Sequence, residues 1–400
     1  MTPADPNPRR AKLPRGVWVL GFVSLFMDTS SELIHAVLPL FLVAGLGLPA
    51  VSVGLIEGVA DATAQITKVF SGAISDRLGK RKIIAFLGYG LAAATKPLFP
   101  LAHGVGLVLF ARFVDRLGKG IRGAPRDALI ADITHSSLHG AAYGLRQALD
   151  SVGGFAGPLL AALLLALFSD GYRAVMWVAV VPALISVTLL GIGIKDSPAA
   201  PVPRPHPPLF SRLHLASLGL HFWVLTGIAF VLIIPRFSEA FLLLRASELG
   251  LRDSYVPLIF VVMNVVYAAA AYPAGMLSDR FSRRHIVFIG FLVLAGAHAV
   301  LAQAQAPAAV FIGAALWGLH LALTQGVFSA MVADFVPPAR RGTGFGIFNF
   351  ATGIALFLGS LAAGWIWDAY GPAAPFALGA AVTVLALAVS PLLPLRPRKA

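Results

Sequence analysis

Charged residues four positions apart recur along the first half of an otherwise apolar chain. Charged residues make up only 12% of its 400 residues. Four pairs stand in apolar sequence: Asp28 with Glu32, Glu57 with Asp61, Arg112 with Arg116, and Arg146 with Asp150. Residues four apart share one face of a helix, so each pair would present two ionisable groups on one side. Such groups can exchange protons or hold a small molecule of opposite charge.

The sequence around these pairs predicts helices that span a membrane. Hydrophobic residues make up 58% of the chain, and its mean hydropathy is +0.82. Twelve spans are expected, near residues 16–44, 50–74, 83–102, 104–123, 138–168, 172–194, 215–246, 254–278, 284–304, 307–335, 340–369 and 373–394. Apolar runs of this length are candidate membrane helices. Ionisable groups inside them are costly in hydrocarbon, so the charged pairs should either line a polar cavity or hold helices together as ion pairs.

A proline-rich stretch divides the predicted spans into two halves. Prolines prevent a helix from continuing, so residues 195–214 are expected to link a six-helix bundle at 1–194 to a second one at 215–400. Lysine and arginine concentrate in the short loops on one side of the predicted spans. Because such loops favour the cytoplasmic side, both termini and the linker are predicted to be cytoplasmic.

The two halves repeat each other in sequence. The segment GAISDRLGKRK returns as GMLSDRFSRRH, so that Asp279 follows Asp76 by 203 positions. A second segment, IADITHSSLHGAAYGL, returns as VADFVPPARRGTGFGI, so that Asp334 follows Asp132 by 202 positions. Two matches at nearly one offset indicate an internal duplication. Halves of the same topology joined by a linker are typical of secondary transporters.

The loop between the predicted second and third spans carries a motif. Its residues are Gly72, Asp76, Arg77, Gly79, Lys80 and Arg81. The motif resembles the signature between helices two and three of the major facilitator superfamily. Its second copy keeps Asp279 and Arg280 but has Ser282 in place of a glycine. We expect these residues, together with Asp132, to form a cytoplasmic gate.

A second motif, in the predicted fifth span, contains Gly153, Gly157 and Pro158. It is similar to the glycine–proline motif of antiporters in that superfamily, although glycines also favour close packing of helices. The resemblance covers nearly the whole chain. It implies an all-α integral membrane protein of twelve helices in two pseudo-symmetric bundles, which would transport a solute by alternating access.

Proton coupling needs a carboxylate whose proton affinity changes as a cation approaches or withdraws. Asp28, Glu32 and Asp61 are the best candidates for that carboxylate, with Arg112 as the approaching cation. The second half is mostly neutral at the corresponding positions, so we expect it to supply substrate contacts. The expected cavity residues there are Arg236, Glu239, Asn264, Trp317, Gln325 and Asn349.

Several other functions have no support in the sequence. The chain has no cysteine, which excludes disulfides and thiolate chemistry. Its histidines are scattered, so that each is interpreted as an ordinary polar residue, and neither a metal site nor a cofactor is predicted. No phosphate-cradling loop is present. The net charge of +13 does not indicate nucleic acid in a membrane protein, and no enzyme activity is predicted.

The sequence therefore predicts proton-coupled export of a small amphipathic or cationic organic compound across a bacterial inner membrane, by a protein expected to be a monomer. The expected partners are this substrate, protons and the lipid bilayer. Three alternatives stay open. Arginines in the spans suit a permease for an organic anion or siderophore, while a metal-ion permease would depend on histidine or carboxylate groups. A non-transporting membrane sensor would show no solute flux.

Overall fold

The computed structural model of the chain describes residues 13–78, 80–135, 138–169, 171–194, 218–337 and 340–394. These residues form helices and connecting turns, and no β-strand occurs among them. The helices of the first half are α1 (Arg15–Leu40) with the π-helical turn η1 (Phe41–Gly45), α2 (Ala50–Leu78), α3 (Arg81–Thr95), α4 (Leu98–Leu101), α5 (Val105–Ile133), α6 (His139–Leu167), α7 (Tyr172–Val178) and α8 (Val180–Gly193).

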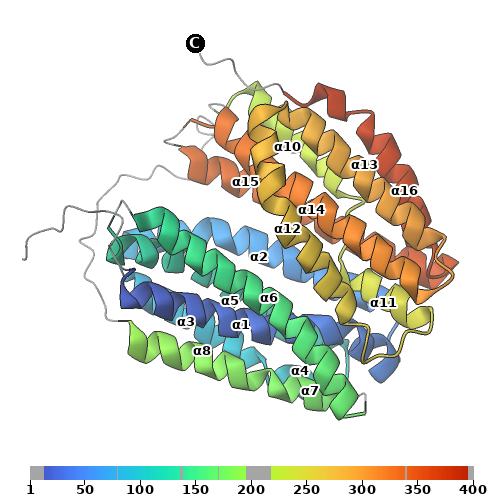
Figure 1. Cartoon of the computed structure of the whole chain (residues 1–400), viewed down its shortest axis with the longest axis horizontal. Helices are drawn as coiled ribbons and strands as arrows, with labels where there is room; N and C mark the ends of the chain where they lie inside the picture. The colour runs from blue at the N-terminus through green and yellow to red at the C-terminus, as the bar shows by residue number, and fades with distance from the viewer. Residues whose placement is uncertain are drawn as a thin grey trace, which may run out of the picture.

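The second half repeats this order of long and short helices. Its elements are α10 (Leu220–Ile233), α11 (Ala240–Glu248), α12 (Leu258–Arg280), α13 (Arg283–Ala302), α14 (Pro307–Phe335), α15 (Arg341–Tyr370), α16 (Ala374–Leu387) and the 3-10 turn η4 (Ser390–Leu392). In Figure 1 the blue-to-green helices of the first half and the yellow-to-red helices of the second half form two adjoining groups.

Nine helical stretches among the described residues are long and apolar enough to cross a membrane. α2 and α5, which carry charged pairs, do not meet those limits of hydropathy and charge. Each of the twelve predicted spans nevertheless coincides with a helix or a pair of helices. The prediction of a membrane-embedded, all-α fold is thus confirmed, while the number of twelve spans stays a prediction.

Two predicted spans differ from the structure in their course. The seventh, expected to be continuous over 215–246, is two helices separated between Ile233 and Ala240. Pro235 lies in this break, and a proline lacks the N–H that a continuing helix would need. The fourth span was expected to end near residue 123, but α5 continues to Ile133 with Pro125 inside it.

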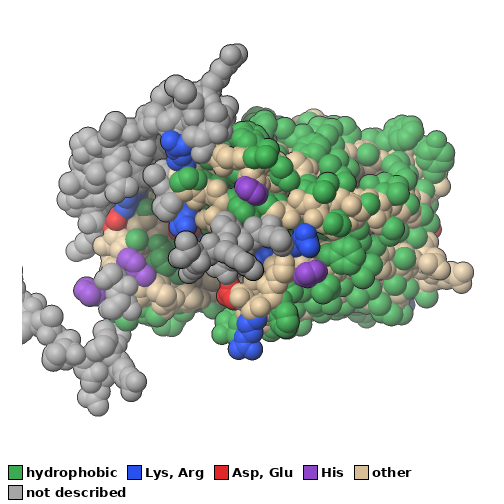
Figure 2. Space-filling model, turned by 90° about the horizontal axis from the view of Figure 1, so that it is seen from above, with side chains coloured by type: hydrophobic (Ala, Val, Ile, Leu, Met, Phe, Trp, Pro, Cys, Tyr) green, Lys and Arg blue, Asp and Glu red, His purple; other side chains and the backbone are tan. Residues whose placement is uncertain are grey.

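The outer surface suits a lipid environment. Large apolar side chains such as Phe110, Leu163 and Leu385 are more than half exposed. In the space-filling view, hydrophobic side chains cover most of the right-hand part of the visible face, and the charged side chains that can be seen lie toward the left (Figure 2). Contiguous apolar surface of this extent indicates contact with a membrane rather than with water.

Glycines bring the two halves into backbone contact where α2 crosses α15. A Cβ atom on Gly54 would lie 2.1 Å from the carbonyl oxygen of Ser360, and one on Gly364 would lie 2.6 Å from the Cα of Val51. A Cβ on Gly58 would meet the backbone of Phe357 at 3.1 Å. Small residues are what allow membrane helices to approach so closely.

Polar contacts close the same end of the molecule. Both carboxylate oxygens of Asp368 accept hydrogen bonds at 2.8 Å from the backbone N–H groups of Ala50 and Val51, which begin α2. A carboxylate there satisfies free donors and complements the helix dipole. The hydroxyl of Tyr172 also donates to Asp253 of the second half. We call this region, residues 41–51, 249–257 and 367–371, the closed end.

Candidate functional site

A buried cluster of four ionisable groups lies between α1, α2 and α5. Arg112 donates to Glu57 at 2.7 Å, and both residues are 1% exposed. The Nδ1 atom of His35 lies 3.3 Å from Glu32, and its Nε2 atom lies 3.3 Å from Glu57. The sequence had offered Arg112 as partner of Asp28, Glu32 or Asp61, but the structure pairs it with Glu57. We call Glu32, His35, Glu57 and Arg112 the histidine cluster.

A second buried ion pair joins α3 to α5. The ammonium of Lys96 lies 2.8 Å from Asp115 and donates to the hydroxyl of Ser31 on α1 at 2.9 Å. Lys96 is 1% exposed and Asp115 is 2% exposed. Arg116 is 3.7 Å from the other oxygen of Asp115. This arrangement ties three helices of the first half together.

We expect Lys96→Met to lower the free energy of unfolding by about 3–5 kcal/mol, because it leaves Asp115 buried with only the 3.7 Å contact of Arg116. Chemical denaturation in detergent micelles would measure the change, with Lys80→Met, at an exposed residue, as the matched control. The double variant Lys96→Met/Asp115→Leu should recover most of the loss. Wild-type stability of Lys96→Met alone would contradict this account of the pair.

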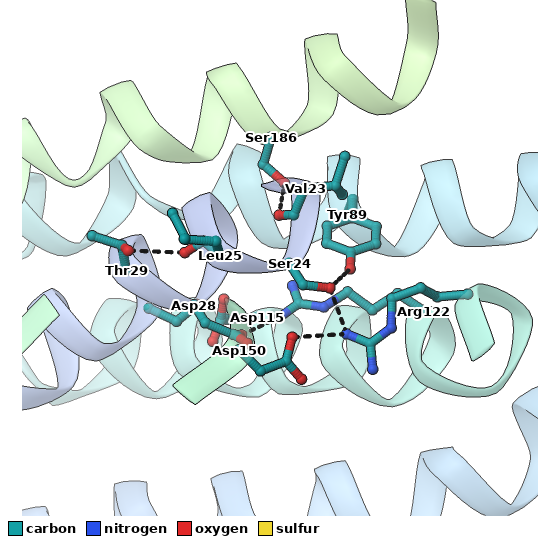
Figure 3. A network of polar contacts seen from close by, with 12 residues as sticks. Val23, Ser24, Leu25, Asp28, Thr29, Tyr89, Asp115, Arg122, Asp150 and Ser186 are labelled. Carbon is teal, nitrogen blue, oxygen red and sulfur yellow. Dashed lines mark hydrogen bonds and ion pairs between the residues drawn. The ribbon is translucent and has the colours of Figure 1, made fainter. Parts of the chain in front are cut away.

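A third cluster connects α1, α3, α5 and α6. Arg122 lies 3.2 Å from Asp28, and its guanidinium stacks 4.6 Å from the ring centre of Tyr89. Tyr89 and Ser24 share a hydrogen bond of 3.1 Å. Figure 3 shows Ser24 and Asp28 of α1 close to Tyr89 of α3 and Asp150 of α6. Asp28, predicted to be a coupling carboxylate, is therefore engaged by an arginine in this state.

Arg146 and Asp150, predicted to share a face of one helix, form an ion pair within α6. Asp150 also lies 3.8 Å from Arg126, while Arg126 lies 3.1 Å from Asp127. Arg126 donates to Ser24 at 2.8 Å, which joins this pair to the cluster around Asp28. Asp127 and Asp150 are thus each paired with an arginine.

Asp61 differs from the other acids of the predicted cavity. It follows Glu57 by one helical turn on α2 and is half-buried. It makes no hydrogen bond or ion pair with any residue that the structure describes, and it lies within electrostatic range of Glu57 and of Glu239 in the second half. A carboxylate without a partner in a membrane span is costly unless a proton or a cationic ligand neutralises it.

Two cations of α5 are also incompletely paired. Arg116 has the 3.7 Å contact with Asp115, but its buried Nε atom donates to none of the described groups. Lys119, half-buried on the same helix, lies within electrostatic range of Glu32 and Asp28 without a direct ion pair to described residues. The neighbouring helices α2 and α5 therefore carry incompletely paired groups of both signs.

The predicted gate is only partly within the described structure. Arg81 pairs with Asp132, and Arg283 pairs with Asp334 at the equivalent place of the second half. Asp279 is exposed and lies 3.7 Å from Arg283. Lys80 and Arg280 are exposed. Gly79 lies outside the described residues, and Gly72, Asp76 and Arg77 are described only as part of helix α2. Their role in a gate therefore stays a prediction.

The glycine–proline motif of α6 packs directly on α1. A Cβ on Gly153 would lie 2.7 Å from the carbonyl oxygen of Leu25, and one on Gly157 would lie 2.8 Å from the Cβ of Glu32. Pro158 follows inside the helix. These glycines therefore set the distance between α6 and the face of α1 that carries the acidic pair.

The expected cavity residues of the second half are dispersed. The amide of Asn264 donates to the carbonyl of Gly154 at 3.4 Å, and the hydroxyl of Tyr267 donates to Gln325 at 3.3 Å. Arg236 and Glu239 lie 3.6 Å apart. A cavity of about 430 Å³ opens between α6 and α12, with Asp150, Asn264 and Tyr267 in its lining. Asn349 is half-buried, and its side chain makes no hydrogen bond to described groups, while its backbone carbonyl accepts one from Thr352 at 3.2 Å.

Trp317 does not line a cavity, contrary to the prediction. It is 0% exposed and packs against Phe237 at 5.7 Å and His298 at 5.2 Å between ring centres. Its size and apolarity suit the core of the second half as well as a binding surface, so the sequence could not distinguish the two.

His35 is the residue that sequence reasoning overlooked. It was treated as an ordinary polar residue because no second histidine stands four positions away. Its spacing of three from Glu32 places both on one helix face, and that was the available signal. Among the described residues, no group of three or more histidine or acidic side chains is arranged to hold a metal ion.

Comparison with known families agrees with this architecture. The Major Facilitator Superfamily pattern matches residues 19–244 and 224–400. An MFS-type transporter of Methanocaldococcus jannaschii is 30% identical over 386 residues, which cover 95% of each chain. The multidrug resistance protein MdtH of Enterobacter sp. is 22% identical over 357 residues, covering 88% of this chain and 84% of that protein.

The chain therefore belongs to the Major Facilitator Superfamily and is a multi-pass membrane transporter rather than an enzyme. Solved structures show the same fold. The nucleoside transporter NupG superposes with a TM-score of 0.80 at 12% identity, covering 94% of this chain and 99% of that one. A bacterial homologue of the human lysosomal transporter Spinster, in an inward-facing and unoccupied conformation, superposes with a TM-score of 0.73 at 15% identity, covering 96% of each chain.

Proposed function

We propose that this transporter exports a small amphipathic organic cation from the cytoplasm in exchange for protons. The observation that carries the proposal is Asp61, a half-buried carboxylate on α2 without an ion-pair partner among the described residues. A proton and a cationic substrate could each neutralise it, but not both at once. Competition of the two for one carboxylate would couple their movement in opposite directions.

Alternating access then follows from how the halves meet. The bundles at 1–194 and 215–400, joined by the linker 195–214, would rock against each other and so form and break the contact of α2 with α15, where glycines permit close backbone approach. Contacts of Asp368 and Tyr172 hold the closed end in the state seen here. We propose that this end faces away from the cytoplasm and that both termini are cytoplasmic, in a monomer of the bacterial inner membrane, because lysine and arginine gather at the other end.

Relatives support export without fixing the substrate. MdtH is named for multidrug resistance, which is typical of proteins that remove several organic compounds from the cell. Asp61 and Glu239 lie within electrostatic range of each other across the two halves. The negative electrostatic potential of these two carboxylates favours a positively charged substrate.

An organic anion is the second candidate, and one observation favours it. Arg116 and Lys119 are incompletely paired and project from α5, the helix beside α2. A carboxylate or phosphate group would suit the guanidinium of Arg116. In that case the substrate would bind at α5 and Asp61 would carry only the proton.

The test uses purified protein in liposomes with a pH-sensitive dye inside and an imposed pH gradient. Ethidium and tetraphenylphosphonium represent organic cations, and salicylate represents organic anions. We expect the cations alone to trigger proton movement, and Asp61→Asn to abolish it. Glu248→Gln, at an exposed acid of the second half outside the predicted gate and cavity, is the matched control and should transport normally.

The outcomes separate the candidates. Proton movement with salicylate but not with the cations would favour the anion permease. Wild-type cation exchange by Asp61→Asn would show that this carboxylate is not the coupling site and would overturn the proposal as stated.

A further inference from the structure

The imidazole of His35 lies between two carboxylates. Glu32 precedes it on α1 and Glu57 faces it from α2, each 3.3 Å from a different ring nitrogen. A neutral imidazole has one N–H donor and one nitrogen that can only accept. Two carboxylates can therefore both contact the ring favourably only if the ring is doubly protonated or if one glutamate carries the proton. Either way, the histidine cluster holds one additional, shared proton.

The charges around the ring show what that proton does. Arg112 from α5 contributes one positive charge against the two carboxylates, so that the cluster is neutral with the shared proton and carries one net negative charge without it. The side chains of His35 and Glu57 are 15% and 2% exposed. A net charge at such a depth is costly, so the proton should leave only when another positive charge arrives or when the surroundings open.

The cluster lies between the closed end and Asp61. Glu57 is about 10 Å along α2 from Ala50, where the helix begins at the closed end, and Asp61 is about 6 Å further. His35 and Glu57 are both within electrostatic range of Asp61. A proton entering from the closed end would thus meet the histidine cluster before it reaches the carboxylate to which we assign the substrate.

The second half covers the imidazole. The ring of Phe260 on α12 lies 4.9 Å from the ring of His35, between their centres, and Phe260 is 1% exposed. The groups that face His35 are therefore Glu32 from α1, Glu57 from α2, Arg112 from α5 and this aromatic ring. When the halves separate at the closed end, the contact with Phe260 must change, and the imidazole becomes accessible from that side.

We propose that His35 carries the transported proton, taking it up from the closed end and passing it to Asp61 as the halves rock. This inference rests on the proposed proton coupling and names its carrier. When the closed end opens, the shared proton is transferred from the ring nitrogen to the carboxylate oxygen of Asp61, and the displaced substrate cation leaves through that end. A proton from the same side then replaces it at the ring nitrogen. After the halves rock, the proton on Asp61 leaves at the opposite end when the next cation binds.

The first experiment separates proton carriage from structural support. In liposomes, His35→Gln should lower uptake of ethidium driven by a pH gradient by roughly 100-fold, the usual contribution of a positioned proton-transfer group. Exchange of ethidium for ethidium needs no net proton movement, so it should continue at the wild-type rate. Parallel loss of both activities, or retention of both, would overturn the proposal. His103→Gln, at an exposed histidine, is the control.

The second experiment needs no substrate. The chain has no cysteine, so spin labels can be placed at Ala44→Cys and Arg252→Cys, which are exposed on the two halves at the closed end. The distance between the labels should change with pH in the wild-type background and in His103→Gln, but not in His35→Gln. Glu32→Gln should move the midpoint to lower pH, because the imidazolium loses one of its carboxylate neighbours.

These readouts remain decisive even if no tested compound is transported. An unchanged pH midpoint in His35→Gln, or a wild-type distance that does not respond to pH, would overturn the assignment of His35. A pH response that depends on His35, combined with no movement of any cation, would instead leave the proton carrier in place and refute the proposed substrate class.

Discussion

Arg112→Gln is expected to abolish coupled transport and to lower the free energy of unfolding by about 3–5 kcal/mol. Arg112 is 1% exposed and donates to Glu57 at 2.7 Å. Without the guanidinium, Glu57 would remain buried with only His35 to balance two carboxylates. Denaturation in detergent would measure the stability, and the liposome assay would measure transport.

Matched variants distinguish the two effects of this substitution. Arg252→Gln, at an exposed arginine, should change neither stability nor transport. The double variant Arg112→Gln/Glu57→Gln removes both charges, so it should regain much of the stability while transport stays absent. If Arg112→Gln alone were as stable as the wild type, the pair would not be the stabilising contact that its geometry indicates.

Gly54→Ala is expected to force the closed end apart. The added Cβ would lie 2.1 Å from the carbonyl oxygen of Ser360, and backbone atoms cannot move aside as a flexible side chain would. Overpacking of this kind costs roughly 1–3 kcal/mol, which corresponds to about a 5- to 150-fold shift in a two-state equilibrium. Because the contact exists only when this end is closed, the substitution should favour the opposite state and slow transport.

The spin labels at positions 44 and 252 provide the measurement, since they should move apart in Gly54→Ala. Gly90→Ala is the control, because a Cβ there would meet nothing within 4 Å. Both substitutions replace a helical glycine by alanine, so any common gain in helix propensity cancels in the comparison. Equal distances in the two variants would show that α2 and α15 can adjust around the added methyl group.

The predictions for Arg112→Gln and Gly54→Ala address different parts of the transporter. Arg112 belongs to charges that are largely internal to the first half, whereas Gly54 belongs to the contact on which the halves move. Charge pairs buried within one half can stay intact while that half rocks as a rigid body. The interface must instead form and break in every cycle, and its polar contacts among the described residues include that of Asp368 at the closed end and that of Asn264 with Gly154.

The sequence by itself determined the class of this protein. Runs of apolar residues are long because each span must cross the hydrocarbon with its backbone satisfied internally, so the spans could be located without a structure. The duplication around Asp76 and Asp279 indicated two similar halves. The sparse charges stood out for the same physical reason, since an ionisable group in a membrane span requires an explanation.

Only the tertiary structure decided which of these charges meet. Arg112 contacts Glu57, Arg122 contacts Asp28, and Lys96 contacts Asp115. Each pair joins helices that are separate in sequence, and its formation depends on the depth and rotation of one helix against another. Close contacts at glycines, such as that of Gly157 in α6 with the backbone of α1, set this depth and rotation. Neither the depth nor the rotation can be derived from the spacing of residues within a single helix.

The same reason explains what the sequence missed. His35 looks isolated along the chain, because one of its two carboxylates comes from α2 and its aromatic cover comes from the second half. The sequence predicted that Trp317 lines the substrate cavity, whereas the packing of α14 buries it in the core of the second half. Composition and periodicity fix where a helix lies relative to the membrane, whereas the packing of helices against one another fixes which side chains become a site.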